Sequence, residues 1–126
     1  MRNAALKVGN ILVNNTSFIE GQTLFVNKPI PDEVLQKKEL PWLQIDGLPV
    51  TENEYASNKK LFELSGCQLN LYSDSNRYLD EQLNKLESLL SIHDYECFFY
   101  DQDYIPDWKI KRLIMRVQTN QKVREF

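Results

Sequence analysis

The fold of this chain is decided by residues 61–117, which read LFELSGCQLNLYSDSNRYLDEQLNKLESLLSIHDYECFFYDQDYIPDWKIKRLIMRV. The first part, 61–72, alternates so that Cys67, Leu69 and Leu71 share one face. Such alternation is typical of a strand with one buried side. The next four residues, SDSN, all favour the position that caps a helix N-terminus. The pattern therefore predicts a strand that leads directly into a capped helix.

Residues 78–92 are the best candidate for that helix, because leucines recur at spacings of four, three and four. At about 1.5 Å per residue, a helix of this length can cover the face of a sheet. An alternating strand that is apolar on both sides is predicted at 95–100, and a longer strand at 108–118. Residues 101–107 are expected to connect the two, and the tail from Thr119 is expected to fray.

The upstream half predicts smaller elements. A helix is expected at 3–13, a short strand at 23–27, one helical turn at 32–38 and a strand at 41–46, while the polar segment 51–60 is expected to be a loop. The order helix, strands, helix, strands indicates an α+β fold. We expect a mostly antiparallel mixed sheet of about four to five strands with two helices packed on one face.

Length and composition fit one domain spanning residues 1–126. With 42% hydrophobic and 26% charged residues, the chain resembles an ordinary globular protein. Its net charge of −3 argues against a general nucleic-acid binder. The first residues lack the pattern of a signal peptide and no apolar run reaches the length of a membrane span, so we expect a cytoplasmic protein.

Charge is divided into two blocks along the second half of the chain. The acidic block contains Asp74, Asp80, Glu81, Glu87, Asp94, Glu96, Asp101, Asp103 and Asp107. The basic block that follows contains Lys109, Lys111, Arg112, Arg116, Lys122 and Arg124. Folding could pair the blocks across adjacent strands. Two interpretations stay open: the charges simply solvate one face, or they form a bipolar surface through which identical subunits meet head to tail.

The sequence contains no recognisable catalytic or metal-binding motif. His93, the one histidine, follows the predicted helix, where it is expected to cap the C-terminus. Cys67 and Cys97 lie in apolar runs and are expected to be small buried hydrophobes. Asp101 and Asp103 belong to an acidic run that lacks the glycine and the terminal glutamate of a calcium-binding loop. We therefore expect neither an enzyme nor a cofactor or metal site.

Two binding surfaces remain as candidates. Trp108 precedes a run of basic residues and could help stack nucleic-acid bases, although the acidic block directly upstream opposes this. The chain also holds more aromatic residues than one small core must hide. Tyrosine and tryptophan are enriched in protein–protein contacts, so exposed aromatic side chains would indicate an interface. The alternative is that they all complete the core.

A series of short motifs within residues 55–117 reads YASNKK, NLYSDS, YLDEQLNKLESLL and DYE. Upstream, TLFVNKPIPDEV and LPWLQID add a short strand, a proline-containing link and a second strand. This succession resembles the tail terminator, or tail-to-head joining, proteins of long-tailed phages, and the resemblance covers most of the chain. It implies a structural virion assembly protein that forms a ring, expected to be a hexamer, on the finished tail tube. The ring ends tube elongation and provides the surface that joins the head.

The resemblance also implies partners and a location. The expected partners are other copies of the chain, the tail tube protein and a head-completion or connector protein, with no membrane and no sequence-specific nucleic acid. The protein would occur in the host cytoplasm during assembly and then in the virion tail. The expected contact residues are Tyr55, Asn58, Lys59, Lys60, Asp101, Asp103, Lys109, Lys111, Arg112 and Arg116. The alternative function is that of a small cytosolic toxin-neutralising protein, a class that is also short, acidic and non-enzymatic.

Overall fold

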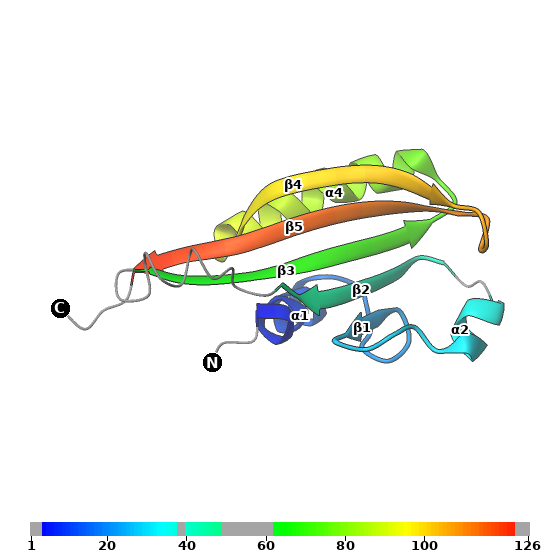
Figure 1. The fold of residues 1–126 in the computed structure, drawn as a ribbon, viewed down its shortest axis with the longest axis horizontal. Helices are drawn as coiled ribbons and strands as arrows, with labels where there is room; N and C mark the ends of the chain where they lie inside the picture. Colours follow the sequence, from blue (N-terminus) through cyan, green and yellow to red (C-terminus); the bar gives the residue numbers. More distant parts are fainter. Residues whose placement is uncertain (1–3, 38–39, 49–61, 123–126) are drawn as a thin grey trace.

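The computed structural model describes residues 4–37, 40–48 and 62–122, which form three helices and one sheet (Figure 1). The elements are α1 (Ala4–Asn15), β1 (Leu24–Val26), α2 (Asp32–Lys37), β2 (Trp42–Gly47), β3 (Phe62–Ser73), α4 (Asn76–Ile92), β4 (Glu96–Ile105) and β5 (Ile110–Lys122). The predicted loop at 51–60 lies outside the described residues. Among those described, no helix is both long enough and apolar enough to cross a membrane.

The five strands form one mixed sheet in the order β1-β2-β3-β5-β4. β1 pairs with β2 in parallel, and the other three pairings are antiparallel. The two longest strands, β3 and β5, pair along twelve residues in the middle of the sheet (Figure 1). This topology confirms the predicted α+β fold with a mostly antiparallel mixed sheet.

Helices α1 and α4 pack on the same face of the sheet, as predicted. The leucine stripe of α4 buries Leu79, Leu86 and Leu90 against the alternating side chains of β3 and β5. Ser75 caps the helix, since its hydroxyl accepts a hydrogen bond from the Tyr78 backbone N–H at 3.2 Å. The main core therefore lies between the two helices and this face of the sheet.

A second, smaller apolar cluster lies on the opposite face. Its buried centre comprises Phe25, Ile30, Trp42, Tyr72 and Ile110. The short helix α2, Trp108 and neighbouring residues pack against this cluster near one end of the sheet. The rest of the face carries mostly polar side chains, with Ile114 and Phe99 among them, and part of it is open to solvent.

Two expectations about the last strands are wrong. Residues 101–105 continue β4 instead of forming a connection, and the hairpin turn occupies only 106–109, where Lys109 adopts a φ of 55°. β5 continues to Lys122, where fraying was expected from Thr119. The physical reason is the same in both cases. Pairing between strands depends on backbone hydrogen bonds, which polar residues form as well as apolar residues do. A polar segment can therefore extend a strand whose first residues are apolar.

Candidate functional site

The sheet has one open edge and one closed edge among the described residues. β1 is only three residues long, and its Leu24 is already engaged: the backbone N–H donates to Ile19 O at 3.1 Å and the carbonyl accepts from Gly21 N at 2.8 Å. β4, at the other edge, is ten residues long, and eight of these are exposed. Unpaired strand edges are ready sites for pairing with another chain. The candidate site is therefore the β4 edge.

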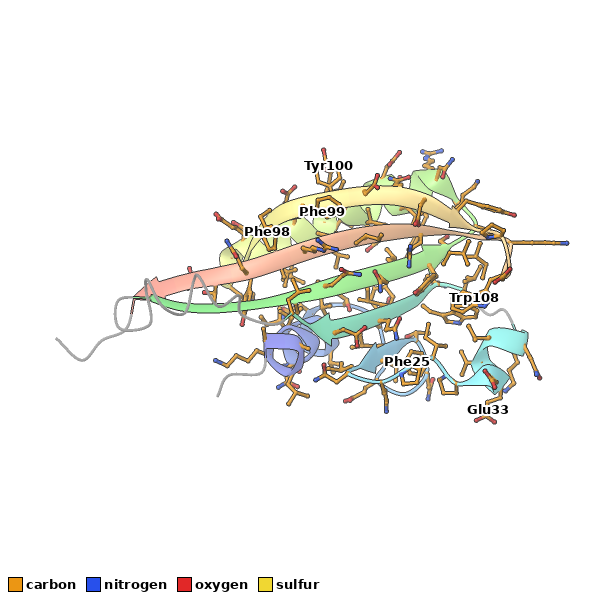
Figure 2. The ribbon with its side chains drawn as sticks, in the orientation of Figure 1. Phe25, Glu33, Phe98, Phe99, Tyr100 and Trp108 are labelled. Atoms are coloured by element: carbon orange, nitrogen blue, oxygen red, sulfur yellow. The ribbon has the colours of Figure 1, made fainter. Side chains whose placement is uncertain are left out.

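A β-bulge places three consecutive aromatic residues on this edge. Cys97 pairs with Val117 and Phe99 pairs with Arg116, so Phe98 is the extra residue. Phe98, Phe99 and Tyr100 are 50%, 40% and 60% exposed. Figure 2 shows the three side chains along β4. The predicted strand with two apolar sides thus exists, but it lies at an edge where little covers it.

The backbone of β4 also directs polar groups outward. The Gln102 backbone N–H donates to the Asp101 carboxylate at 2.9 Å, which indicates that it points away from β5. Backbone groups of an antiparallel strand alternate in direction, so Tyr100 and Tyr104 direct theirs to the same outer side as Gln102. Tyr104, like Tyr100, is exposed, at 54%. The outer edge of β4 therefore presents hydrogen-bonding groups flanked by aromatic side chains.

Arg116 fixes the position of one of these aromatic rings. Its guanidinium lies 4.9 Å from the centroid of the Phe99 ring, within range of a cation–π interaction. Its Nε also donates to Gln68 Oε1 at 2.9 Å. Phe99 is thus held against β5 by a side chain that is itself anchored on β3.

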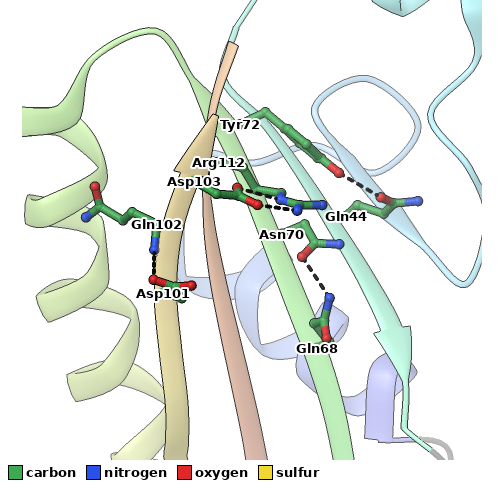
Figure 3. Close-up of polar contacts among 8 residues, drawn as sticks. All are labelled: Gln44, Gln68, Asn70, Tyr72, Asp101, Gln102, Asp103 and Arg112. Carbon is green, nitrogen blue, oxygen red and sulfur yellow. Dashed lines mark hydrogen bonds and ion pairs between the residues drawn. The ribbon is translucent and has the colours of Figure 1, made fainter. Parts of the chain in front are cut away.

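Polar side chains form a network on the open face of the sheet beside β4 (Figure 3). The Arg112 guanidinium donates two hydrogen bonds to Asp103, with Nε 2.9 Å from Oδ1. Further across the sheet, the Tyr72 hydroxyl donates to Gln44 at 3.4 Å. Arg112 also donates a side-chain hydrogen bond to the Tyr72 hydroxyl, so these contacts join side chains from four adjacent strands.

The pairing of Asp103 with Arg112 changes the ionisation of both groups. Hydrogen bonds from Arg112 lower the pKa of Asp103, and those to Asp103 raise the pKa of Arg112. Burial raises the pKa of Tyr72 on the same face. Both members of the Asp103–Arg112 pair are therefore charged at neutral pH. The acidic and basic blocks do pair across adjacent strands here, as the sequence suggested they could.

The structure distributes the predicted contact residues over several environments. Asp101 is exposed on β4, Lys109 is exposed in the hairpin turn, and Lys111 donates from Nζ to the Asp74 carbonyl at 3.4 Å. Asp103 forms the ion pair with Arg112 described above. Arg116 contacts Gln68 and Phe99. The remaining predicted contact residues, Tyr55, Asn58, Lys59 and Lys60, lie outside the described part of the chain.

Sequence reasoning did not single out the exposed aromatic residues of β4 as a site. The sequence leaves open whether its surplus aromatic residues, Phe98 and Tyr100 among them, complete the core or reach the surface. The sequence holds one local hint of their exposure: FFY is followed directly by DQDY, so an apolar run becomes acidic with no glycine or proline between the two. A buried strand would not carry two carboxylates in that position.

The one histidine and the two cysteines occupy structural positions. His93 is the exposed C-cap of α4, and its backbone N–H donates to Leu90 O at 3.0 Å. Burial raises the pKa of the Cys67 thiol to about 12, and burial also raises the pKa of Cys97. Neither thiol therefore has the lowered pKa of a reactive cysteine. Within the described ranges, no three His, Cys, Asp or Glu residues gather in a way that could hold a metal ion.

What the β4 edge can do is associate. It combines outward backbone donors and acceptors, which can form ladder hydrogen bonds, with aromatic surface that gains free energy when buried. No protein-family model matches the chain, and no curated protein matches it. A functional assignment therefore depends on the sequence pattern and on this surface.

Proposed function

We propose that this protein is a structural virion assembly protein that caps the tail tube of a long-tailed phage as a ring. In this role it ends tail elongation and provides the surface that joins the head. The observation that carries the proposal is the exposed aromatic edge of β4. Such a surface suits association with other protein, while the thiols and the histidine have structural explanations. The motif succession that resembles tail terminator proteins supplies the specific role.

The argument from the edge is energetic. Soluble proteins that stay alone protect their edge strands with charges, prolines or covering segments, because an open edge invites pairing. Here Phe98, Phe99, Tyr100 and Tyr104 are each at least 40% exposed. Burying apolar surface contributes about 25 cal/mol per Å², so leaving four aromatic side chains in solvent forgoes stability that association would recover. A protein that assembles has a use for this arrangement.

Ring closure adds a geometric condition. A ring of identical subunits needs two different surfaces that complement each other, repeated by one rotation. The two edges of this sheet are different but do not complement each other, since β4 is open and Leu24 of β1 is engaged within the chain. A continuous sheet running from β4 of one copy to β1 of the next is therefore disfavoured. We expect neighbouring copies to meet through side-chain contacts that bury more than about 1,000 Å².

The first test is the mass of the assembled protein, measured by light scattering across a range of concentrations. The chain has a mass of 14.9 kDa, so a hexamer would weigh about 89 kDa. Tyr100→Lys should shift the equilibrium toward the monomer, because it places a charge in the aromatic surface. Ile19→Lys is the matched control, since Ile19 is similarly exposed, at 53%, but lies before β1. A chain that stays monomeric in the presence of tail tubes would overturn the proposal.

The second test addresses the specific role. Purified protein mixed with tail tubes should bind at tube ends, where electron microscopy would show rings. Binding along the tube walls, or no binding, would contradict a terminator role.

The alternative, a toxin-neutralising protein, is favoured by one observation: the acidic residues Glu96, Asp101 and Asp103 are all exposed on β4. An acidic surface can complement a basic toxin. A neighbouring toxin gene would favour this alternative, whereas a neighbouring tail tube or tape-measure gene would favour the ring.

A further inference from the structure

We infer that β4 accepts an extended segment of another protein, which adds to the sheet as a further antiparallel strand and carries alternating basic and apolar residues. The inference deepens the proposed function, and it rests on that function for the identity of the partner as a tail or head protein. The chemistry of the segment follows from the β4 edge itself. Three features carry it: the open ladder, the distribution of side chains between the two faces, and the charge of the strand.

The open ladder is long enough for specific pairing. β4 has ten residues, and its outward backbone groups include those of Tyr100, Gln102 and Tyr104. An added strand would form hydrogen bonds with these groups in the same way as β5 does on the inner side. The Asp101 carboxylate now accepts from the Gln102 N–H at 2.9 Å. It can rotate away when a backbone carbonyl of the partner takes its place.

The register of β4 with β5 assigns its side chains to faces. Tyr100 pairs with Met115 and Gln102 with Leu113, and both β5 residues are buried in the core under the helices. Tyr100, Gln102 and Tyr104 therefore lie on the helix-covered side of the sheet. Asp101 and Asp103 pair with Ile114 and Arg112, which places them on the open face. One face of β4 thus presents Phe99 and two carboxylates, and the other presents two tyrosine rings on either side of Gln102, whose side-chain amide donates to Asp80 of α4 at 2.6 Å.

An added strand keeps the same alternation, because side chains of paired strands lie on matching faces. Its residues on the open face would lie beside Asp101 and Asp103 and would be stabilised by a positive charge, above all beside Asp101, because Arg112 already pairs with Asp103. Its residues on the other face would lie beside Tyr100 and Tyr104 and would be stabilised by apolar character. The expected ligand is therefore a strand in which Lys or Arg alternates with Val, Ile or an aromatic residue.

Charge also argues against a second copy of the chain as the occupant. Residues 96–105 contain Glu96, Asp101 and Asp103 and no lysine or arginine. Two copies paired edge to edge around a two-fold axis at Asp101 or Asp103 would place that carboxylate opposite itself, and like charges directly opposite are destabilising. Among the described ion pairs, Arg112 neutralises Asp103, whereas none involves Glu96 or Asp101. The strand therefore carries unbalanced negative charge that a basic partner would complement.

The test uses the full chain and three synthetic decapeptides of equal composition. The first alternates valine and lysine, the second places all lysines in one half, and the third alternates but is N-methylated at every second backbone amide. Binding is measured by calorimetry, and amide hydrogen exchange is measured at Tyr100, Gln102 and Tyr104. We expect the alternating peptide to bind at least about tenfold more tightly than either control and to slow exchange at these amides. Equal binding of the three peptides would show that charge alone acts and would overturn the inference.

Two variants test the same site from the protein side. Asp101→Lys should weaken binding of the alternating valine–lysine peptide about tenfold, and it should allow an alternating valine–glutamate peptide to bind. Asp74→Lys is the matched control, because Asp74 is exposed but lies outside β4. Gln102→Pro removes one outward N–H, which an edge strand tolerates, and should also weaken binding. If Asp74→Lys weakens binding as much as Asp101→Lys, the peptide does not dock on β4.

The outcomes separate this inference from the proposed function. Ring formation by the chain alone, with no preference for the alternating peptide, would overturn the added strand and leave the ring intact. Peptide docking on β4 of a chain that stays monomeric in the presence of tail tubes would support the added strand and overturn the ring. A two-fold dimer formed through β4 in the absence of peptide would identify a second copy as the occupant and would overturn the inference.

Discussion

The Asp103–Arg112 pair offers a sharp test of whether the charged blocks stabilise the fold itself. The perturbation is a double-mutant cycle that combines Asp103→Asn with Arg112→Gln. Each change removes a charge while keeping a polar side chain of similar size. The cycle measures the coupling free energy between the two side chains, which is separate from what each contributes elsewhere.

The magnitude follows from the geometry. Arg112 donates from two nitrogens to the two oxygens of Asp103, and the side chains are 27% and 39% exposed. A bidentate pair is stronger than a single contact, but solvent at this exposure screens much of the charge. For a cross-strand pair of opposite charge we therefore expect a coupling of about 0.5–1 kcal/mol. Arg77 with Glu81, on the surface of α4 and 89% and 54% exposed, is the control pair, for which we expect about 0.3 kcal/mol.

The assay is urea unfolding followed by circular dichroism at low and high salt. The coupling should fall as salt rises. It should also depend on pH, with a sign given by the pKa of Asp103, which is lower in the folded chain than in the unfolded chain. The stabilisation is therefore fully present above the ordinary carboxyl pKa and is lost as pH falls through the lowered value. A coupling no larger than that of Arg77 with Glu81 would refute the reasoning.

Three further predictions concern the core and its helix. Ser75→Ala should lower the free energy of unfolding by about 1 kcal/mol in urea titrations, because the Tyr78 N–H loses its acceptor; no loss would mean that the cap is not formed in solution. Leu69→Ala should lower the free energy of unfolding by about 2–5 kcal/mol in the same titrations, because the side chain is only 1% exposed. A loss below about 1 kcal/mol would contradict this burial. The Cys67 thiol, with its pKa raised to about 12, should react with a thiol reagent only as fast as the chain unfolds, so rapid labelling of the native protein at Cys67 would contradict the structure.

Most of the fold could be predicted because its elements have strong local signals. The leucine stripe ending at Leu90 and the cap residue Ser75 together define α4, and both act within a few residues of the chain. The alternation of Cys67, Leu69 and Leu71 likewise reports which face of β3 is buried, and all three are at most 1% exposed. Patterns of this kind follow from geometry that any helix or strand must satisfy.

The length and position of β4 could not be predicted in the same way. Whether a strand lies at an edge depends on its neighbours, which the local pattern does not contain. The sequence predicts a connection at 101–107, which contains Asp101 and Asp103, and acidic residues are indeed rare in buried strands. At an edge, with Arg112 across the ladder on β5, an acidic strand is stable. The candidate site escaped prediction for the same reason, since exposure of Phe98 and Tyr100 is a consequence of strand order.

An acidic edge has a second possible explanation, which is protection: charged residues on an edge strand prevent pairing with other chains. Protection alone does not account for β4. An edge that is only protected should expose little apolar surface. On β4, however, Phe98, Phe99 and Tyr100 follow one another in the sequence, and Tyr104 comes after the two aspartates. The two features act in different directions, because the carboxylates disfavour another acidic strand and the aromatic rings favour burial under some strand. A partner strand in which basic residues alternate with apolar residues would suit both the carboxylates and the aromatic rings. The acids then disfavour backbone pairing of identical copies along this edge and select the partner strand.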